Sequence, residues 1–140
     1  MAFSGYLIKL GGPGGTELPM KYIKAEGYDI TPNQRMEAEA KRSITGVLYR
    51  STVPHTASKI EFNTPNMTNT DVEAMMNLFR TAWQQTGSVL ERKLKLEYYD
   101  METNSYKTGD FYMPDIKFQI SRVNGSKIIY RETRIAFIEY

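Results

Sequence analysis

The central part of the chain carries an apolar stripe with the spacing of an α-helix. Its members recur three or four positions apart: Val72, Met75, Met76, Phe79 and Trp83. This spacing places them on one helical face. Thr70 and Glu73 have the spacing of a capping box, and Gly87 follows the stripe, so the sequence predicts a helix over about 70–86. We expect its apolar face to cover a β-sheet.

Beyond this helix the apolar spacing changes from helical to alternating. Leu94, Leu96 and Tyr98 alternate with charged residues, which predicts a strand with one face in solvent. A polar connection at 100–105 and the Asn124–Gly125 turn predict two hairpins, so we expect an antiparallel meander. The strands expected in it are 93–98, 106–113, 116–121, 127–131 and 134–140.

Upstream of the helix the pattern is less decisive. Residues 34–42 have good helix propensity, but their apolar residues also alternate with charged ones. We favour a strand, because a helix there has no second apolar row to bury. A loop is expected at 52–58 and a short strand at 59–62. The alternating run 6–10 is also typical of a strand.

Glycine and proline interrupt the chain directly after residue 10. The segment 11–15 is costly to order, and it lacks the lysine and the helix that follow in a phosphate-binding loop. We therefore interpret it as a flexible loop. Residues 1–20 are expected to form a flexible N-terminal arm on a single domain that spans 1–140.

About seven or eight strands with one helix predict a mainly β protein. The expected architecture is an antiparallel β-sandwich or partly closed barrel with one flanking α-helix. The residues expected in its core are Tyr6, Ile8, Leu48, Ile60, Phe62, Phe79, Trp83, Leu94, Leu96, Phe118, Ile120, Ile135 and Phe137.

Composition narrows the classes of partner. The 140 residues, 41% of them hydrophobic, are enough for one domain with its own core. With 18 Lys and Arg against 16 Asp and Glu, the net charge of +2 does not single out a polyanion. The absence of cysteine excludes disulfides and thiolate chemistry. The first residues lack the features of a signal peptide, and no membrane partner is expected.

Candidate catalytic chemistry is scarce. His55 is the only histidine, which excludes a multi-histidine metal site, and we interpret it as an exposed loop residue. No spacing singles out a pair of carboxylates for hydrolysis. The segment 100–104 lacks the glycine and terminal glutamate of a calcium loop. We expect no enzyme activity, no catalytic residue, no cofactor and no metal.

Aromatic residues keep one binding function open. The chain has 10 Tyr and 6 Phe, and several tyrosines lie near lysine or arginine in the sequence. On a β-barrel such residues can stack single-stranded bases. They are equally typical of half-buried strands and of protein interfaces. A single-stranded nucleic-acid-binding β-barrel is therefore kept as an alternative function.

Five runs, spread over most of the chain beyond residue 20, carry a resemblance to a known family. They are Tyr28–Asn33, Lys59–Pro65, Arg92–Asp100, Tyr106–Asp115 and Arg134–Tyr140. These runs resemble small tail structural proteins encoded in prophages of Gram-positive bacteria. The resemblance implies a tail-tube or distal-tail fold, a β-sandwich with one flanking helix that assembles as a hexameric ring.

The resemblance also implies a function and a set of partners. It suggests a structural subunit of a bacteriophage tail or baseplate, which rings the tail channel and contacts neighbouring rings of the virion. The partners would be further copies of the chain and other tail proteins, with DNA or the tape-measure protein only as channel contents. The protein would be assembled in the bacterial host cytoplasm. A carbohydrate- or receptor-binding module of the virion is a further alternative.

We expect the contacts between subunits to involve the arm and the loop around the histidine. The candidate interface residues are Tyr6, Ile8, Leu10, Gly11, Gly12, Pro13, Gly14, Gly15 and His55. The tube, the tail terminator, the distal tail and the baseplate ring all stay open as positions in the tail.

Overall fold

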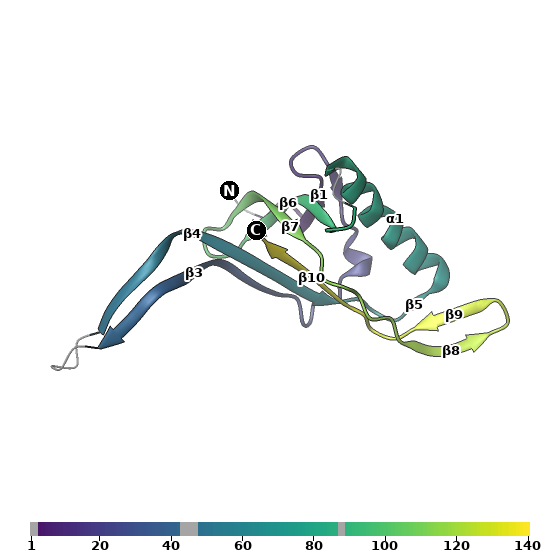
Figure 1. Ribbon diagram of the computed structural model, residues 1–140. Helices are drawn as coiled ribbons and strands as arrows, with labels where there is room; N and C mark the ends of the chain where they lie inside the picture. The colour runs from purple at the N-terminus through teal and green to yellow at the C-terminus, as the bar shows by residue number, and fades with distance from the viewer. Residues whose placement is uncertain (1–2, 43–47, 87–88) are drawn as a thin grey trace.

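In the computed structural model, one α-helix packs on one face of a large antiparallel sheet, and a second, small sheet adjoins it (Figure 1). The structure describes residues 3–42, 48–86 and 89–140, and within 35–56 and at Thr86 it describes the backbone alone. Gly87, expected to end the helix, lies outside these residues. The mainly β, antiparallel fold with one flanking helix is confirmed, and the sheets are open rather than closed into a barrel.

The elements in the described residues are ten strands, one α-helix and one short 3-10 helix. The strands are β1 (Ile8–Leu10), β2 (Thr16–Glu17), β3 (Asp29–Arg42), β4 (Leu48–Asn63), β5 (Met67–Thr68), β6 (Lys93–Asp100), β7 (Ser105–Tyr112), β8 (Ile120–Asn124), β9 (Lys127–Tyr130) and β10 (Arg134–Glu139). The helices are η1 (Met20–Tyr22) and α1 (Asn69–Thr86).

The strand order shows that the C-terminal part is not a meander. The large sheet has the order β2-β1-β6-β7-β10-β4-β3, and the small sheet the order β5-β9-β8. The β6–β7 and β8–β9 hairpins form as expected. However, β10 pairs with β7 and β4, so the β8–β9 hairpin leaves the large sheet and pairs with β5 instead.

The core lies between α1 and the large sheet. The helical stripe is confirmed, because Met75, Met76, Phe79 and Trp83 are buried. Phe137 lies at the centre, with its ring centroid 6.0 Å from that of Phe79 and 6.4 Å from that of Phe62. The other expected core residues that are buried are Ile8, Ile60, Leu94, Leu96 and Ile135. Tyr6 is half-buried, and the side chain of Leu48 is outside the description.

The prediction of burial in the core is wrong for two residues. Phe118 is 40% exposed and Ile120 is 53% exposed. The expected strand over 116–121 forms only from Ile120 onward, as β8. All residues of β8, an edge strand of the small sheet, are exposed. Alternation identifies two faces of a strand, but it does not say whether either face is covered.

The helix begins earlier than its expected cap. Thr68 and Asp71 form a reciprocal cap: the Thr68 hydroxyl donates to Asp71 Oδ2 at 3.2 Å, and the Asp71 N–H donates to Thr68 Oγ1 at 3.5 Å. Thr70 already lies inside α1, so the capping box expected from Thr70 and Glu73 is wrong. Thr68 and Asp71 have the same capping-box spacing as Thr70 and Glu73. The pair that caps the helix is the one that comes first in the sequence.

The first half of the chain forms one long hairpin. Residues 34–42 belong to β3, so the favoured strand assignment is confirmed. The loop expected at 52–58 is wrong, because these residues continue β4. Between Arg35 and Glu37 the paired residue moves from Thr56 to Thr52, which is a bulge on β4. Pro54 lies in this bulge. Proline has no N–H to donate, and at a bulge the regular inter-strand hydrogen bonds are already interrupted.

We predict that the cap at Thr68 stabilises the fold and that Thr70 does not. Thr68→Ala is expected to lower the free energy of unfolding by about 1 kcal/mol, the usual cost of a lost cap. Thr70→Ala, at an exposed helical position, is expected to stay within about 0.5 kcal/mol of wild type. Chemical denaturation measures both. A larger loss for Thr70→Ala would contradict the assignment.

We also predict a large difference between two phenylalanines. Phe137→Ala removes a fully buried ring and is expected to cost about 3–5 kcal/mol of stability. Phe118→Ala, at an exposed position, is expected to cost less than about 1 kcal/mol. Guanidinium denaturation gives both values, with Phe137→Leu as a milder substitute if the alanine variant does not fold. Equal losses at the two positions would contradict the described core.

Candidate assembly surface

The β3–β4 hairpin extends beyond the body of the protein (Figure 1). At its inner end β4 is held between β3 and β10, which pairs with residues 59–63. Further out, in the described residues, β3 and β4 pair with each other as far as Arg42 and Leu48. Residues 48–57 of β4 therefore span about 30 Å at ~3.3 Å per residue. A ribbon of this length offers a surface that the body of the same chain does not cover.

His55 lies in this ribbon. It was expected in a loop, but it belongs to β4, next to Pro54 in the bulge. The structure describes only its backbone, so its role at a subunit interface stays a prediction.

The other candidate interface residues lie at the opposite end of the large sheet. Ile8 and Leu10 belong to β1, and both side chains are buried in the core of the same chain. Segment 11–15 forms the turn from β1 to β2. In this turn a Cβ on Gly15 would lie 2.0 Å from the carbonyl oxygen of Leu10, so the turn requires glycine there. The structure thus brings 6–15 together, and separates them from His55.

Tyr6 belongs to an aromatic cluster on β6 and β7. Its ring stacks on that of Tyr106 with 4.5 Å between centroids, and the Tyr106 hydroxyl donates to the Tyr6 carbonyl at 2.8 Å. The Tyr6 hydroxyl donates to Glu97. That hydrogen bond, followed by burial and the charge of Glu97, raises the pKa of Tyr6 to about 12. Within one chain, this N-terminal segment is therefore attached to the body.

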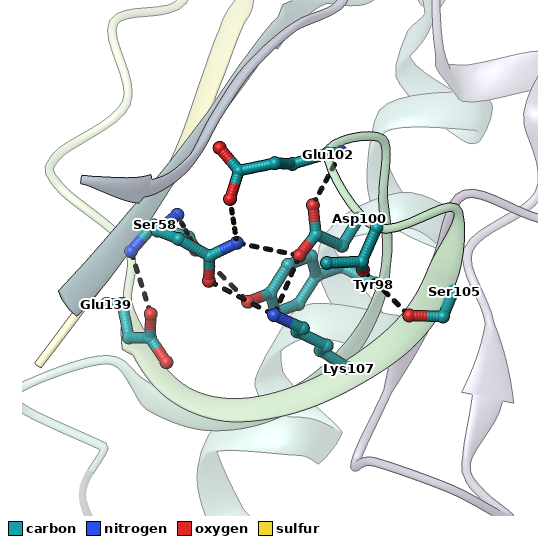
Figure 2. Close-up of polar contacts among 9 residues, drawn as sticks. Ser58, Tyr98, Asp100, Glu102, Ser105, Lys107 and Glu139 are labelled. Carbon is teal, nitrogen blue, oxygen red and sulfur yellow. Dashed lines mark hydrogen bonds and ion pairs between the residues drawn. The ribbon is translucent and has the colours of Figure 1, made fainter. Parts of the chain in front are cut away.

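A polar cluster lies where the long hairpin leaves the sheet (Figure 2). We call it the root cluster, and its members are Asn33, Ser58, Tyr98, Asp100, Lys107 and Glu139. Asn33 occupies a bulge of β3, because the paired residue moves from Lys59 to Ala57 while β3 advances from Thr31 to Gln34. Its φ of 52° is left-handed, a conformation that asparagine adopts more readily than most residues.

Asp100 is the centre of the root cluster. Its side chain has no exposed surface. Oδ2 accepts a hydrogen bond from the Asn33 side-chain amide at 2.8 Å and forms an ion pair with Lys107 Nζ at 3.0 Å. Its other oxygen, Oδ1, accepts the N–H of Glu102 at 2.8 Å. Burial alone raises the pKa of Asp100, but these three contacts outweigh burial and lower it below its usual value. The carboxylate is therefore charged and bonded.

Ser58 ties the second strand of the hairpin to the same place. Its N–H donates to Glu139 Oε1 at 2.7 Å, and its hydroxyl lies 3.1 Å from the Tyr98 hydroxyl. Figure 2 shows these side chains converging from β4, β6 and β10. Gly109 of β7 leaves room for Glu139, because a Cβ there would lie 2.3 Å from Glu139 Oε2.

The sequence contains a signal for this cluster that the hydrophobic pattern alone does not reveal. Leu94, Leu96, Tyr98 and Asp100 alternate in phase, and all four side chains are buried. Asp100 was instead grouped with the polar hairpin connection at 100–105. A charged residue in phase with buried leucines is costly unless it is paired, so its phase points to a partner.

Other kinds of site find little support among the described residues. No three metal-ligating side chains there lie close enough to hold an ion. Helix α1 is not apolar enough to cross a membrane, and no other helix in the described ranges is either.

A solved structure has a similar fold. It is described as "Tail of empty GTA particle computed with helical refinement, C6 symmetry". The likeness covers 99% of this chain and 95% of that chain, with a TM-score of 0.52 and 14% sequence identity. At this identity the likeness shows the fold alone. No curated protein matches the chain.

A family model matches the whole chain, residues 1–140, and its description is "Family of unknown function (DUF6711)". The match includes the helix, both sheets and the long hairpin. The chain belongs to the DUF6711 family.

Proposed function

We propose that this chain is a structural subunit of a phage tail or of a phage-like particle's tail, without enzyme activity. The observation that carries the proposal is the long β3–β4 hairpin, which leaves a body with the fold of a chain from a C6-symmetric tail. In the described residues, the outer part of this hairpin pairs in backbone register only between its own two strands, and such a ribbon is suited to a contact with another subunit. We further propose that six copies close a ring and that the hairpin reaches a neighbouring copy or ring.

The open edges of the large sheet support a ring. Its edge strands are β2 and β3, and exposed sheet edges favour pairing with another chain. A contact between two different surfaces of the same chain closes into a ring when the rotation between copies allows it. We propose that the edges of the large sheet meet in this way, with the arm residues around Tyr6 close to one edge.

The charge on the sheet supports a channel wall. On the face of β6 opposite α1, Lys93, Lys95 and Glu97 alternate with the buried leucines. Lys9 of β1 pairs in register with Glu17 and Glu97. Such a face of mixed charge does not bind phosphates tightly, so DNA or a tape-measure protein would pass along it. A position in a virion tail assembled in the host cytoplasm follows from this proposal. A Gram-positive host, the baseplate and a prophage origin stay predictions.

Solution mass and negative-stain images test the proposed assembly. The wild-type chain is expected to form rings or short tubes with six-fold symmetry at high concentration. A variant in which Asn-Gly replaces residues 36–55 keeps the Arg35–Thr56 register and closes a short hairpin. It is expected to remain folded by circular dichroism but to lose assembly between subunits.

Two outcomes would contradict this proposal. One is assembly of the short-hairpin variant to the same extent as wild type. The other is a strictly monomeric wild type that binds single-stranded DNA with a steep dependence on salt, which would favour the nucleic-acid-binding alternative. Binding of glycans by the monomer would favour the receptor-binding alternative.

A further inference from the structure

We propose that the root cluster is a clamp that fixes the direction in which the β3–β4 hairpin leaves the body, with Asn33 and Asp100 as its positioning residues. The direction of the hairpin is a property of the single chain. Its importance for assembly rests on the function proposed above.

The backbone alone leaves this junction weak. The ladder between β4 and β10 ends at Lys59, which pairs with Ile138. One residue further, the bulge at Pro32 and Asn33 interrupts the ladder between β3 and β4. A two-stranded ribbon is only marginally stable by itself and twists strongly. Without other contacts, the ribbon would swing about this junction.

Side chains replace the missing ladder on both strands. On β3, the Asn33 amide donates to Asp100, and the Asn33 N–H donates to Ser58 Oγ at 3.0 Å. On β4, Ser58 is held by Glu139 and Tyr98. These anchors come from β6 and β10, which belong to the central part of the large sheet. Hydrogen bonds on both strands restrict rotation of the ribbon relative to the large sheet. A hydrogen bond on one strand alone would leave the ribbon free to rotate about that contact.

Burial makes the clamp selective for one hairpin position. Asp100 has no exposed surface, and a buried charge is costly when it loses a partner. If the hairpin moved away, Asp100 would lose the Asn33 amide and keep Lys107 and the Glu102 N–H. The hairpin position that satisfies the carboxylate completely is therefore favoured. Glycine at residue 109 of β7 leaves the space that Glu139 Oε2 occupies, so this side chain can lie beside Ser58.

Spin-label distance measurements test the clamp directly. The chain has no cysteine, so Ala74→Cys on the exposed side of α1 and Ser51→Cys on β4 give one labelled pair. The clamp predicts a single narrow distance distribution for this pair. Asn33→Gly keeps the left-handed backbone but removes the side-chain ties, and is expected to broaden or shift the distribution.

The matched control is Asn104→Gly. Asn104 has the same φ of 52° but lies in the β6–β7 turn, outside the root cluster. This control is expected to leave the distribution unchanged. Asp100→Asn is expected to broaden it, and Asp115→Asn, which removes an exposed carboxylate, is expected to have no effect.

Hydrogen exchange provides a second measurement that does not depend on labels. In Asn33→Gly, exchange of the hairpin amides next to the bulge is expected to rise about tenfold, the effect of losing one hydrogen bond to a charged group. Amides of the β6–β7 hairpin beyond Asp100 should keep their protection.

The clamp is overturned if Asn33→Gly gives a distance distribution as narrow as wild type at the same mean distance. Both measurements are made on dilute monomer, so their result stands whether or not the chain assembles. A wild type that forms no rings but has a narrow distribution contradicts the proposed function alone. Rings formed by an Asn33→Gly chain with unchanged distances contradict the clamp alone.

Discussion

Contact between α1 and the large sheet holds the molecule together. Phe137 of β10 lies between Phe79 of the helix and Phe62 of β4, so one ring joins the helix to the central strands. Burial of aromatic rings is the largest contribution that single residues make to such a core. Because only one face of the sheet is covered by α1, the chain has a buried apolar layer on one side and charged residues on the other. The hairpins extend from this body.

The buried face changes character along its strands. On β4 the inward positions run from Phe62 and Ile60 to Ser58, and on β6 they run from Leu96 to Tyr98 and Asp100. Under the helix these positions are apolar, and at the far end, where the hairpin leaves, they are polar. The same alternation that builds the core thus builds the root cluster. A residue's position along the strand decides which of the two roles it has.

Periodicity predicts the elements whose partners are close in sequence. The helix and the β6–β7 and β8–β9 hairpins follow from local spacing and turn residues. Strand order does not, because nothing near Arg134 specifies that β10 pairs with β4, more than seventy residues away. The prediction that Phe118 is buried fails for a related reason, since its exposure depends on whether another element covers it.

The candidate site was harder to predict than the fold. Residues 52–58 contain proline, histidine and small polar residues, which favour a loop, although Thr52, Val53 and Thr56 favour a strand. Pairing with β3 decides between them. Asp100 is polar and adjoins a turn, so its composition suggests a loop, and only its phase with the buried leucines indicates otherwise. His55 was singled out because it is the only histidine, a reason unrelated to its position in β4.

The irregular register of β3 has a consequence for how this edge pairs with other chains. Extra residues interrupt the strand near Asn33 and again between Glu37 and Glu39, and Pro32 lacks an N–H. A flat, regular edge can pair with any extended segment and grow into aggregates, whereas a bulged edge accepts few registers. The edge of β3 therefore pairs with another chain in only a few registers, which disfavours indiscriminate β-aggregation while specific assembly stays open to it.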